Sequence, residues 1–189
     1  MKKYEVVLMV DPSRKETDRK SLLKEFEDML WSNLLEKDDI GLQDLVYNLG
    51  SKAGNNRAYF VSYYVQGDNT SVKDIKKFLL YKEGILRYSI FSMTNTQVFH
   101  YLEKVSKELE DIIAGWEWTK FGQKLLFFAN DKNQGYISRK SLPMLQKYVT
   151  RFGNIKPRKY TNNPVNVQKK LRSVILRARE MWLIDYTKK

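Results

Sequence analysis

Four runs of apolar and β-branched residues alternate with two amphipathic segments through the first half of the chain. The four runs have the composition of β-strands: KYEVVLMV, LQDLVYNL, RAYFVSYYVQ and ILRYSIFSM. Between them, apolar residues recur at three- and four-residue steps, first from Leu22 to Leu34 and then from Val72 to Leu79. This spacing predicts two helices, so the order is strand, helix, strand, strand, helix, strand.

That order is typical of a ferredoxin-like βαββαβ domain, in which an antiparallel sheet carries two helices on one face. We assign it to residues 1–95. Residues 96–135 are predicted to be a partly helical connector, and residues 136–189 a small basic all-helical domain. In the last domain a short helix is expected near Ser141, and a longer helix is expected to be capped by Asn163. The predicted fold class is therefore α+β.

The positive charge of the chain is concentrated in its last part. The whole chain has a net charge of +12, and residues 136–189 hold 14 Lys and Arg against 2 Asp and Glu. Between residues 153 and 179 there are eight Lys and Arg and no acid. A field of this kind attracts phosphate backbones or anionic membranes.

The expected last helix has two different faces. At 100° per residue, an apolar stripe runs from Val167 to Trp182, and the cations lie outside it. Three interpretations remain open for the cationic face: nucleic acid binding, a solvated surface, or a membrane surface. The membrane interpretation is disfavoured because Trp182 is the only aromatic residue of the stripe. No stretch of the sequence reaches the roughly 20 apolar residues of a membrane span.

The candidate RNA-binding residues are basic or polar, and most lie in the loop and helix after Gly153. They are Lys156, Arg158, Lys159, Thr161, Asn162, Gln168, Lys169, Lys170, Arg172, Arg177 and Arg179, together with Arg87 and Lys3 from the first half. Arg87 could equally be a solvent-facing strand residue, and Lys3 a solvated one. The aromatic residues at 59, 60, 63 and 64 could pack in the core or against the second domain, or they could stack on bases.

The sequence GNIKPRKYTNNPVNVQKKLRSVILRAREMWLIDY resembles the C-terminal signature of the bacterial small-subunit ribosomal protein eighteen family. The matching residues form a Gly-x-Ile-x-Pro-Arg loop, a Gln-Lys-Lys-Leu helix and an Arg-Ala-Arg tract before Tyr186. The first part is similar to the small-subunit ribosomal protein six family, through KYEVVLMVDP, GLQDLVY, AYFVSYYV and ILRYSIF. The chain therefore resembles a fusion of the two.

The resemblance implies a structural constituent of the ribosomal small subunit that binds rRNA of the central domain, or platform, as the equivalent of a heterodimer. The implied partners are small-subunit rRNA and neighbouring ribosomal proteins, with no membrane and no small-molecule substrate. We also expect the six-like domain to dock on the stripe from Val167 to Trp182. The alternative is a free RNA-binding translational regulator. The expected location is the ribosome, with an organelle favoured over the bacterial cytoplasm.

The residue types argue against catalysis and metal binding. There is no Cys, and His100 is the single histidine, so neither a thiolate nor a histidine metal site is expected. Acylphosphatases share the strand and helix order of the first half, but no glycine-rich cradle surrounds Arg14. We therefore expect no enzyme activity and no cofactor.

Overall fold

The computed structural model describes residues 2–48, 56–93, 99–114 and 127–187. The chain divides into two compact units, Met1–Phe99 and His100–Lys189. Each unit has its own cluster of buried hydrophobic residues. The two units are therefore described one at a time.

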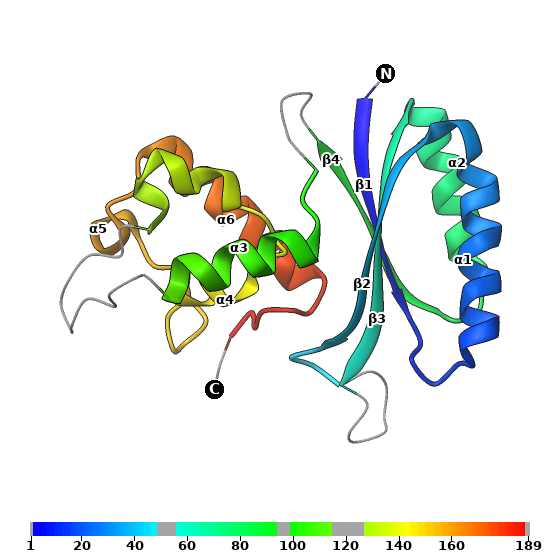
Figure 1. Ribbon diagram of the computed structural model, residues 1–189, viewed down its shortest axis with the longest axis horizontal. Coiled ribbons are helices and arrows are strands. Elements are labelled where there is room, and N and C mark those ends of the chain that lie inside the picture. Colours follow the sequence, from blue (N-terminus) through cyan, green and yellow to red (C-terminus); the bar gives the residue numbers. More distant parts are fainter. Residues whose placement is uncertain (1, 49–55, 94–98, 115–126, 188–189) are drawn as a thin grey trace. The chain divides into compact units, whose positions relative to one another are not determined.

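The first unit is an antiparallel four-stranded sheet with two helices on one face (Figure 1). The elements in chain order are β1 (Lys2–Val10), α1 (Glu16–Leu30), a 3-10 turn (Trp31–Asn33), β2 (Leu34–Asp44), β3 (Arg57–Gly67), α2 (Asn69–Leu80) and β4 (Ile85–Met93). The strand order is β2-β3-β1-β4, so β1 is central and pairs with both β3 and β4. The predicted ferredoxin-like βαββαβ domain is confirmed.

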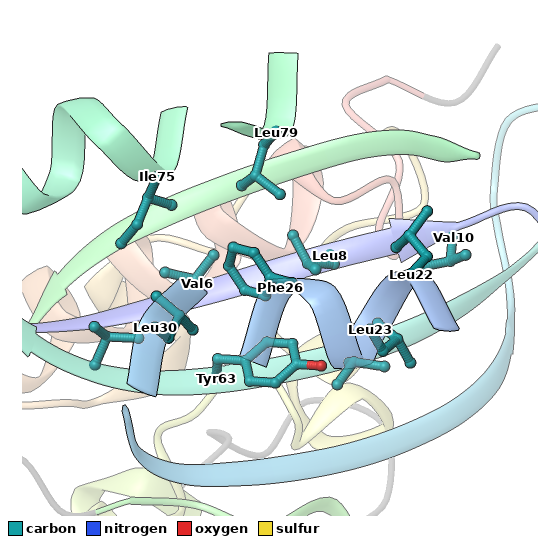
Figure 2. Packing of buried hydrophobic residues seen from close by; sticks show 12 residues of the cluster. Val6, Leu8, Val10, Leu22, Leu23, Phe26, Leu30, Tyr63, Ile75 and Leu79 are labelled. Atoms are coloured by element: carbon teal, nitrogen blue, oxygen red, sulfur yellow. The ribbon is translucent and has the colours of Figure 1, made fainter. Parts of the chain in front are cut away.

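The first core lies between this sheet and its two helices. Successive strand residues point to opposite faces, so Val6, Leu8 and Val10 of β1 reach the helices together. Phe26 of α1 is fully buried and meets the Tyr63 ring edge-on at 5.1 Å between centroids. Figure 2 shows these side chains converging. Burying each large apolar side chain stabilises the unit by about 1.5–3 kcal/mol.

The second strand differs from the sequence prediction. We predicted a strand over 42–49, whereas β2 runs over Leu34–Asp44, where charged residues dominate. This is an edge strand that pairs only with β3, so its outer positions tolerate charge. Lys37, for example, pairs with Glu27 of α1 at 2.7 Å.

The second unit is helical in its described part. Its elements are α3 (Leu102–Ala114), two 3-10 segments (Phe127–Ala129 and Asp131–Tyr136), α4 (Leu142–Lys147), the short α5 (Arg158–Thr161) and α6 (Val165–Glu180). After α4, an antiparallel bridge between Val149 and Ile155 turns the chain back into the basic loop, which we define as residues 154–163. The predicted all-helical character is therefore confirmed for these residues.

The segment that we expected as a connector takes part in the second core. Val105 and Leu109 of α3, with Phe127 and Phe128, are buried in the same cluster as the apolar face of α6. Residues 115–126 of the expected connector lie outside the described residues. The described parts of 96–135 beyond Phe99 therefore belong to the second unit.

The apolar stripe of α6 packs inside its own unit. Val167, Leu171, Ile175 and Ala178 are fully buried in the second cluster, which also contains residues of α3 and α4. The hypothesis that this stripe receives the first domain was therefore wrong, because the stripe is already filled by the second unit's own side chains. The sequence identified the buried face correctly but assigned it the wrong partner.

Candidate nucleic-acid interface

A groove of about 500 Å³ lies between the basic loop and the first turns of α6. Four cationic side chains line it: Lys156 and Arg158 from the loop side, and Lys169 and Arg172 from α6. The remaining lining residues are polar or apolar, and none of them is acidic: Asn154, Ile155, Pro157, Val165 and Gln168. An anion entering this groove meets positive charge from two sides.

Gln168 fixes the shape of the groove through hydrogen bonds to the loop. Its Nε2 donates to the Lys156 carbonyl at 2.9 Å. Its Oε1 accepts from the Thr161 hydroxyl at 3.0 Å and from the Asn163 side-chain amide at 3.2 Å. One α6 side chain therefore holds both ends of the loop segment from Lys156 to Asn163.

Arg158 is anchored at one edge of its guanidinium group. Its Nε donates to the Asn163 carbonyl at 2.9 Å, while the residue as a whole remains exposed. The turn that makes this contact possible closes at Asn162, whose φ of 54° is left-handed. The terminal nitrogens of Arg158 keep four N–H donors beyond the one at Nε. Such a planar fork suits phosphate.

The helix start differs from the prediction that Asn163 would cap it. Pro164 occupies the N-cap position of α6 and makes no side-chain capping bond, while Asn166 Oδ1 accepts from the Val167 amide in the first turn. Asn163 is buried and points its amide at Gln168 instead. The positive end of the helix dipole therefore adds to the field of the nearby cations.

Besides Arg158, five predicted RNA-binding cations are well placed to meet a polyanion. Lys169 and Arg172 are exposed and line the groove, and Lys159 and Lys170 are exposed beyond the lining residues. Lys156 is half-buried and also lines the groove. Helical spacing placed Lys169, Lys170 and Arg172 outside the apolar stripe of α6, as observed, and the RNA contacts of all these residues stay predictions.

Thr161 and Gln168 have an internal role in this fold. Thr161 is fully buried, and its hydroxyl is committed to Gln168. Both were predicted as RNA-binding residues because polar side chains of this kind bond phosphates and 2′-hydroxyls of RNA. Asn162, by contrast, is exposed at the turn.

Arg179 is a structural residue, contrary to the expectation that it lies off the buried side of α6. It is only 7% exposed. Its Nε donates to the Asp185 carbonyl at 3.0 Å, and its Nη2 donates to the Gly153 carbonyl. The guanidinium also lies 5.6 Å from the Tyr186 ring centroid. Arg177, two residues earlier, is half-buried.

Lys3 and Arg87 belong to the first unit and are not part of the groove. By strand alternation both lie on the sheet face opposite α1 and α2. Both are half-buried, and the Lys3 ammonium lies 5.5 Å from the Phe99 ring centroid. Their proposed RNA contacts stay predictions.

The aromatic residues of β3 are mostly buried. Phe60, Tyr63 and Tyr64 have 0–2% of their surface exposed, and Tyr59 is half-buried against the first core. Tyr64 stacks on Phe99 at 4.4 Å between centroids. This arrangement agrees with the core-packing interpretation, since buried rings cannot stack on bases.

The sequence reasoning missed the apolar lining of the groove. Ile155, Pro157 and Val165 line it beside the cations, but the site residues were chosen only for positive charge or polar side chains. The alternation of apolar and polar residues in the loop could have indicated a two-sided lining. Among the described residues there is no cluster of three or more metal-ligating side chains and no helix long and apolar enough to cross a membrane.

Comparison with known proteins accounts for this basic unit. Residues 133–184 match the family model described as ribosomal protein S18. A small ribosomal subunit protein bS18 of Mesoplasma florum is 36% identical over 70 residues, covering 37% of this chain and 91% of that protein. The chain belongs to the ribosomal protein S18 family. A bS18 of Clostridium kluyveri is 37% identical over 65 residues, covering 34% of this chain and 76% of that protein.

The first unit of this S18-family chain matches a second family. Residues 3–92 match the family model described as ribosomal protein S6. A small ribosomal subunit protein bS6 of Phytoplasma australiense is 28% identical over 93 residues, covering 48% of this chain and 97% of that protein. The chain is therefore an S6–S18 fusion, a structural and non-enzymatic ribosomal protein of these two small-subunit families. The relatives named here are bacterial, which gives no support to the preference for an organelle.

Proposed function

We propose that this chain binds rRNA of the central domain of the small subunit, as a one-chain equivalent of an S6–S18 heterodimer. The groove between the basic loop and α6 supports this proposal most directly. Lys156, Arg158, Lys169 and Arg172 line it with no acid among the lining residues. So many like charges repel one another, and bound phosphates relieve that repulsion.

The fusion contributes to this function through a high local concentration. A tether converts assembly of two modules into an intramolecular step, at an effective concentration of roughly millimolar for a short linker. Two separate proteins would have to meet at their free concentrations instead. The partners of the chain would then be rRNA and neighbouring small-subunit proteins.

Salt dependence gives a quantitative expectation. If the four groove cations each neutralise one phosphate, the logarithm of the binding constant should fall with the logarithm of salt at a slope of about −2.8 to −3.6. Replacing both Lys169 and Arg172 by Ala removes two of these charges. The slope should then become shallower by about 1.4 to 1.8.

The experiment compares a central-domain junction RNA with a shuffled duplex of equal length, across a salt series. The matched control replaces Lys73 and Lys76, two exposed cations of α2, by Ala and removes the same charge. We expect selective binding that the groove double variant weakens and the control leaves within about twofold. Equal binding of both RNAs, or equal losses in the two double variants, would contradict the proposal.

Cofractionation separates the ribosomal role from the alternative of a free translational regulator. A ribosomal component should sediment with small subunits, whereas a free regulator should remain at the top of the gradient. An organellar location stays a prediction that the same fractionation can test in cells with organelles.

A further inference from the structure

The groove holds an apolar surface that phosphate binding does not require. Val165 is 52% exposed at the start of α6, Pro157 is exposed in the loop, and Ile155 is half-buried beside them. Phosphate oxygens gain nothing from such side chains. A planar base gains free energy from them, because packing removes both the face of the base and the apolar side chains from water.

The groove is also held in shape by bonds within the protein. Gln168 ties the Lys156 carbonyl, Thr161 and Asn163 to α6, and Arg158 is anchored on the Asn163 carbonyl. A cavity prepared in this way loses little conformational entropy when it is filled. Its volume of about 500 Å³ lies in the range of sites that enclose small organic groups, roughly 300–1,000 Å³.

We propose that the groove receives a single unstacked nucleotide of the RNA. The base packs against Val165, Pro157 and Ile155, and its phosphate lies between Lys169 and Arg172. This inference rests on the proposed function, since RNA is the ligand. It adds that the contact is made to a splayed-out, single-stranded nucleotide and not only to a duplex backbone.

The chemistry of the groove favours an unpaired nucleotide over a duplex. Bases stacked inside an A-form helix keep their faces covered, so a duplex offers the apolar residues nothing to pack against. Loops and bulges expose base faces and edges together. The side-chain amides of Asn154 and Gln168 line the groove and can hydrogen-bond to the edge of a base. Gln168 Nε2 donates one hydrogen to the Lys156 carbonyl and has a second hydrogen for this contact.

The test uses ligands that differ only in the base. The full chain, labelled at its methyl groups, is titrated with adenosine or uridine 5′-monophosphate and separately with ribose 5-phosphate. A base over the groove should shift the methyl resonances of Ile155 and Val165 upfield through its ring current. Ribose 5-phosphate should move the amide resonances near Lys169 without that methyl shift.

Two variants give a matched comparison on the same helix. Val165→Ala should weaken nucleotide binding about three- to tenfold and leave the affinity for ribose 5-phosphate unchanged. Leu176→Ala, at a 42% exposed position of α6 outside the groove lining, should change neither affinity. Both positions are exposed, so both variants should fold.

The outcomes separate this inference from the proposed function. Equal affinities for nucleotide and sugar phosphate, no binding of the nucleotides, or ring-current shifts only outside the groove would overturn the inference. Methyl shifts at Ile155 and Val165 would support it even if central-domain RNA were not bound selectively. Selective, salt-dependent RNA binding without base-dependent shifts would uphold the proposed function and overturn the inference.

Discussion

Replacing Arg179 by Ala should destabilise the second unit strongly, although Arg179 lies in the most basic part of the chain. Arg179 is only 7% exposed, and its guanidinium bonds two carbonyls from different segments, Asp185 in the tail and Gly153 in the loop after α4. Alanine at this position leaves both carbonyls without their donor. It also releases the tail, where Tyr186 packs beside the guanidinium.

The magnitude follows from these contacts. A hydrogen bond from a charged donor contributes about 1.5–3 kcal/mol, so two such bonds set an upper range of roughly 3–6 kcal/mol. Ordering a long arginine side chain costs about 2 kcal/mol, which the variant no longer has to meet. We therefore expect the free energy of unfolding to fall by about 1–4 kcal/mol.

Urea denaturation of the full chain at pH 7, followed by circular dichroism, measures this change. Arg172→Ala is the control, because Arg172 is an exposed cation on the same helix and its loss should stay within about 0.5 kcal/mol. Arg179→Lys should fall between the two, since it keeps the charge but loses the fork. An Arg179→Ala chain as stable as wild type, yet impaired in RNA binding, would refute the reasoning and restore Arg179 as a contact residue.

Three further changes probe the surroundings of the groove. Gly153→Ala should lower the melting temperature by several degrees. The φ of Gly153 is +85°, which is unfavourable for alanine, and the added Cβ would lie 2.7 Å from the Tyr186 carbonyl oxygen. An unchanged Tm would contradict this prediction. Gln168→Ala should lower the free energy of unfolding, measured by urea denaturation, by about 1–3 kcal/mol, because the hydrogen-bond partners of Gln168 lose their bonds. It should also speed amide hydrogen exchange in the loop. Unchanged exchange would show that other contacts hold the loop. Burial raises the pKa of Tyr148 from 10.0 to about 12. Folding therefore favours the protonated phenol, and its contribution to the free energy of unfolding is complete below pH 10. Between pH 10 and 12 the free energy of unfolding should fall by about 1–3 kcal/mol more than that of Tyr148→Phe, which has no phenol to titrate.

The elements with a clear apolar period could be predicted from the sequence. β1 and β3 are nearly continuous apolar runs because both are inner strands, and α6 shows its buried stripe at helical spacing. The prediction misplaced β2 because it is an edge strand. Its solvent-facing positions hold charged residues, some of them in ion pairs such as Lys37 with Glu27. Period and propensity do not identify a strand of that kind.

The candidate site was predictable in its charge but not in its burial. Helical spacing places Lys169 and Arg172 on the outer face of α6, as observed. Arg179 lies just beyond the edge of the apolar stripe, and its bonds to Asp185 in the folded tail and to Gly153 in the loop after α4 make it internal. Gln168 likewise makes several internal hydrogen bonds only because the basic loop folds against α6. Contacts between segments decide such cases, and they leave no local periodic signal.

The central place of β1 has a consequence for synthesis on the ribosome. This strand is made before β3 and β4, and its residues Val6–Val10 are fully buried in the finished unit. Its two hydrogen-bonding neighbours arrive much later: Ser62 of β3 and Ser89 of β4 are the partners of Val7. At about 5–20 residues per second, this apolar strand waits for several seconds with both edges open. The nascent chain is therefore most prone to aggregation before β4 emerges, and a trigger-type chaperone acting in that interval would have the most effect.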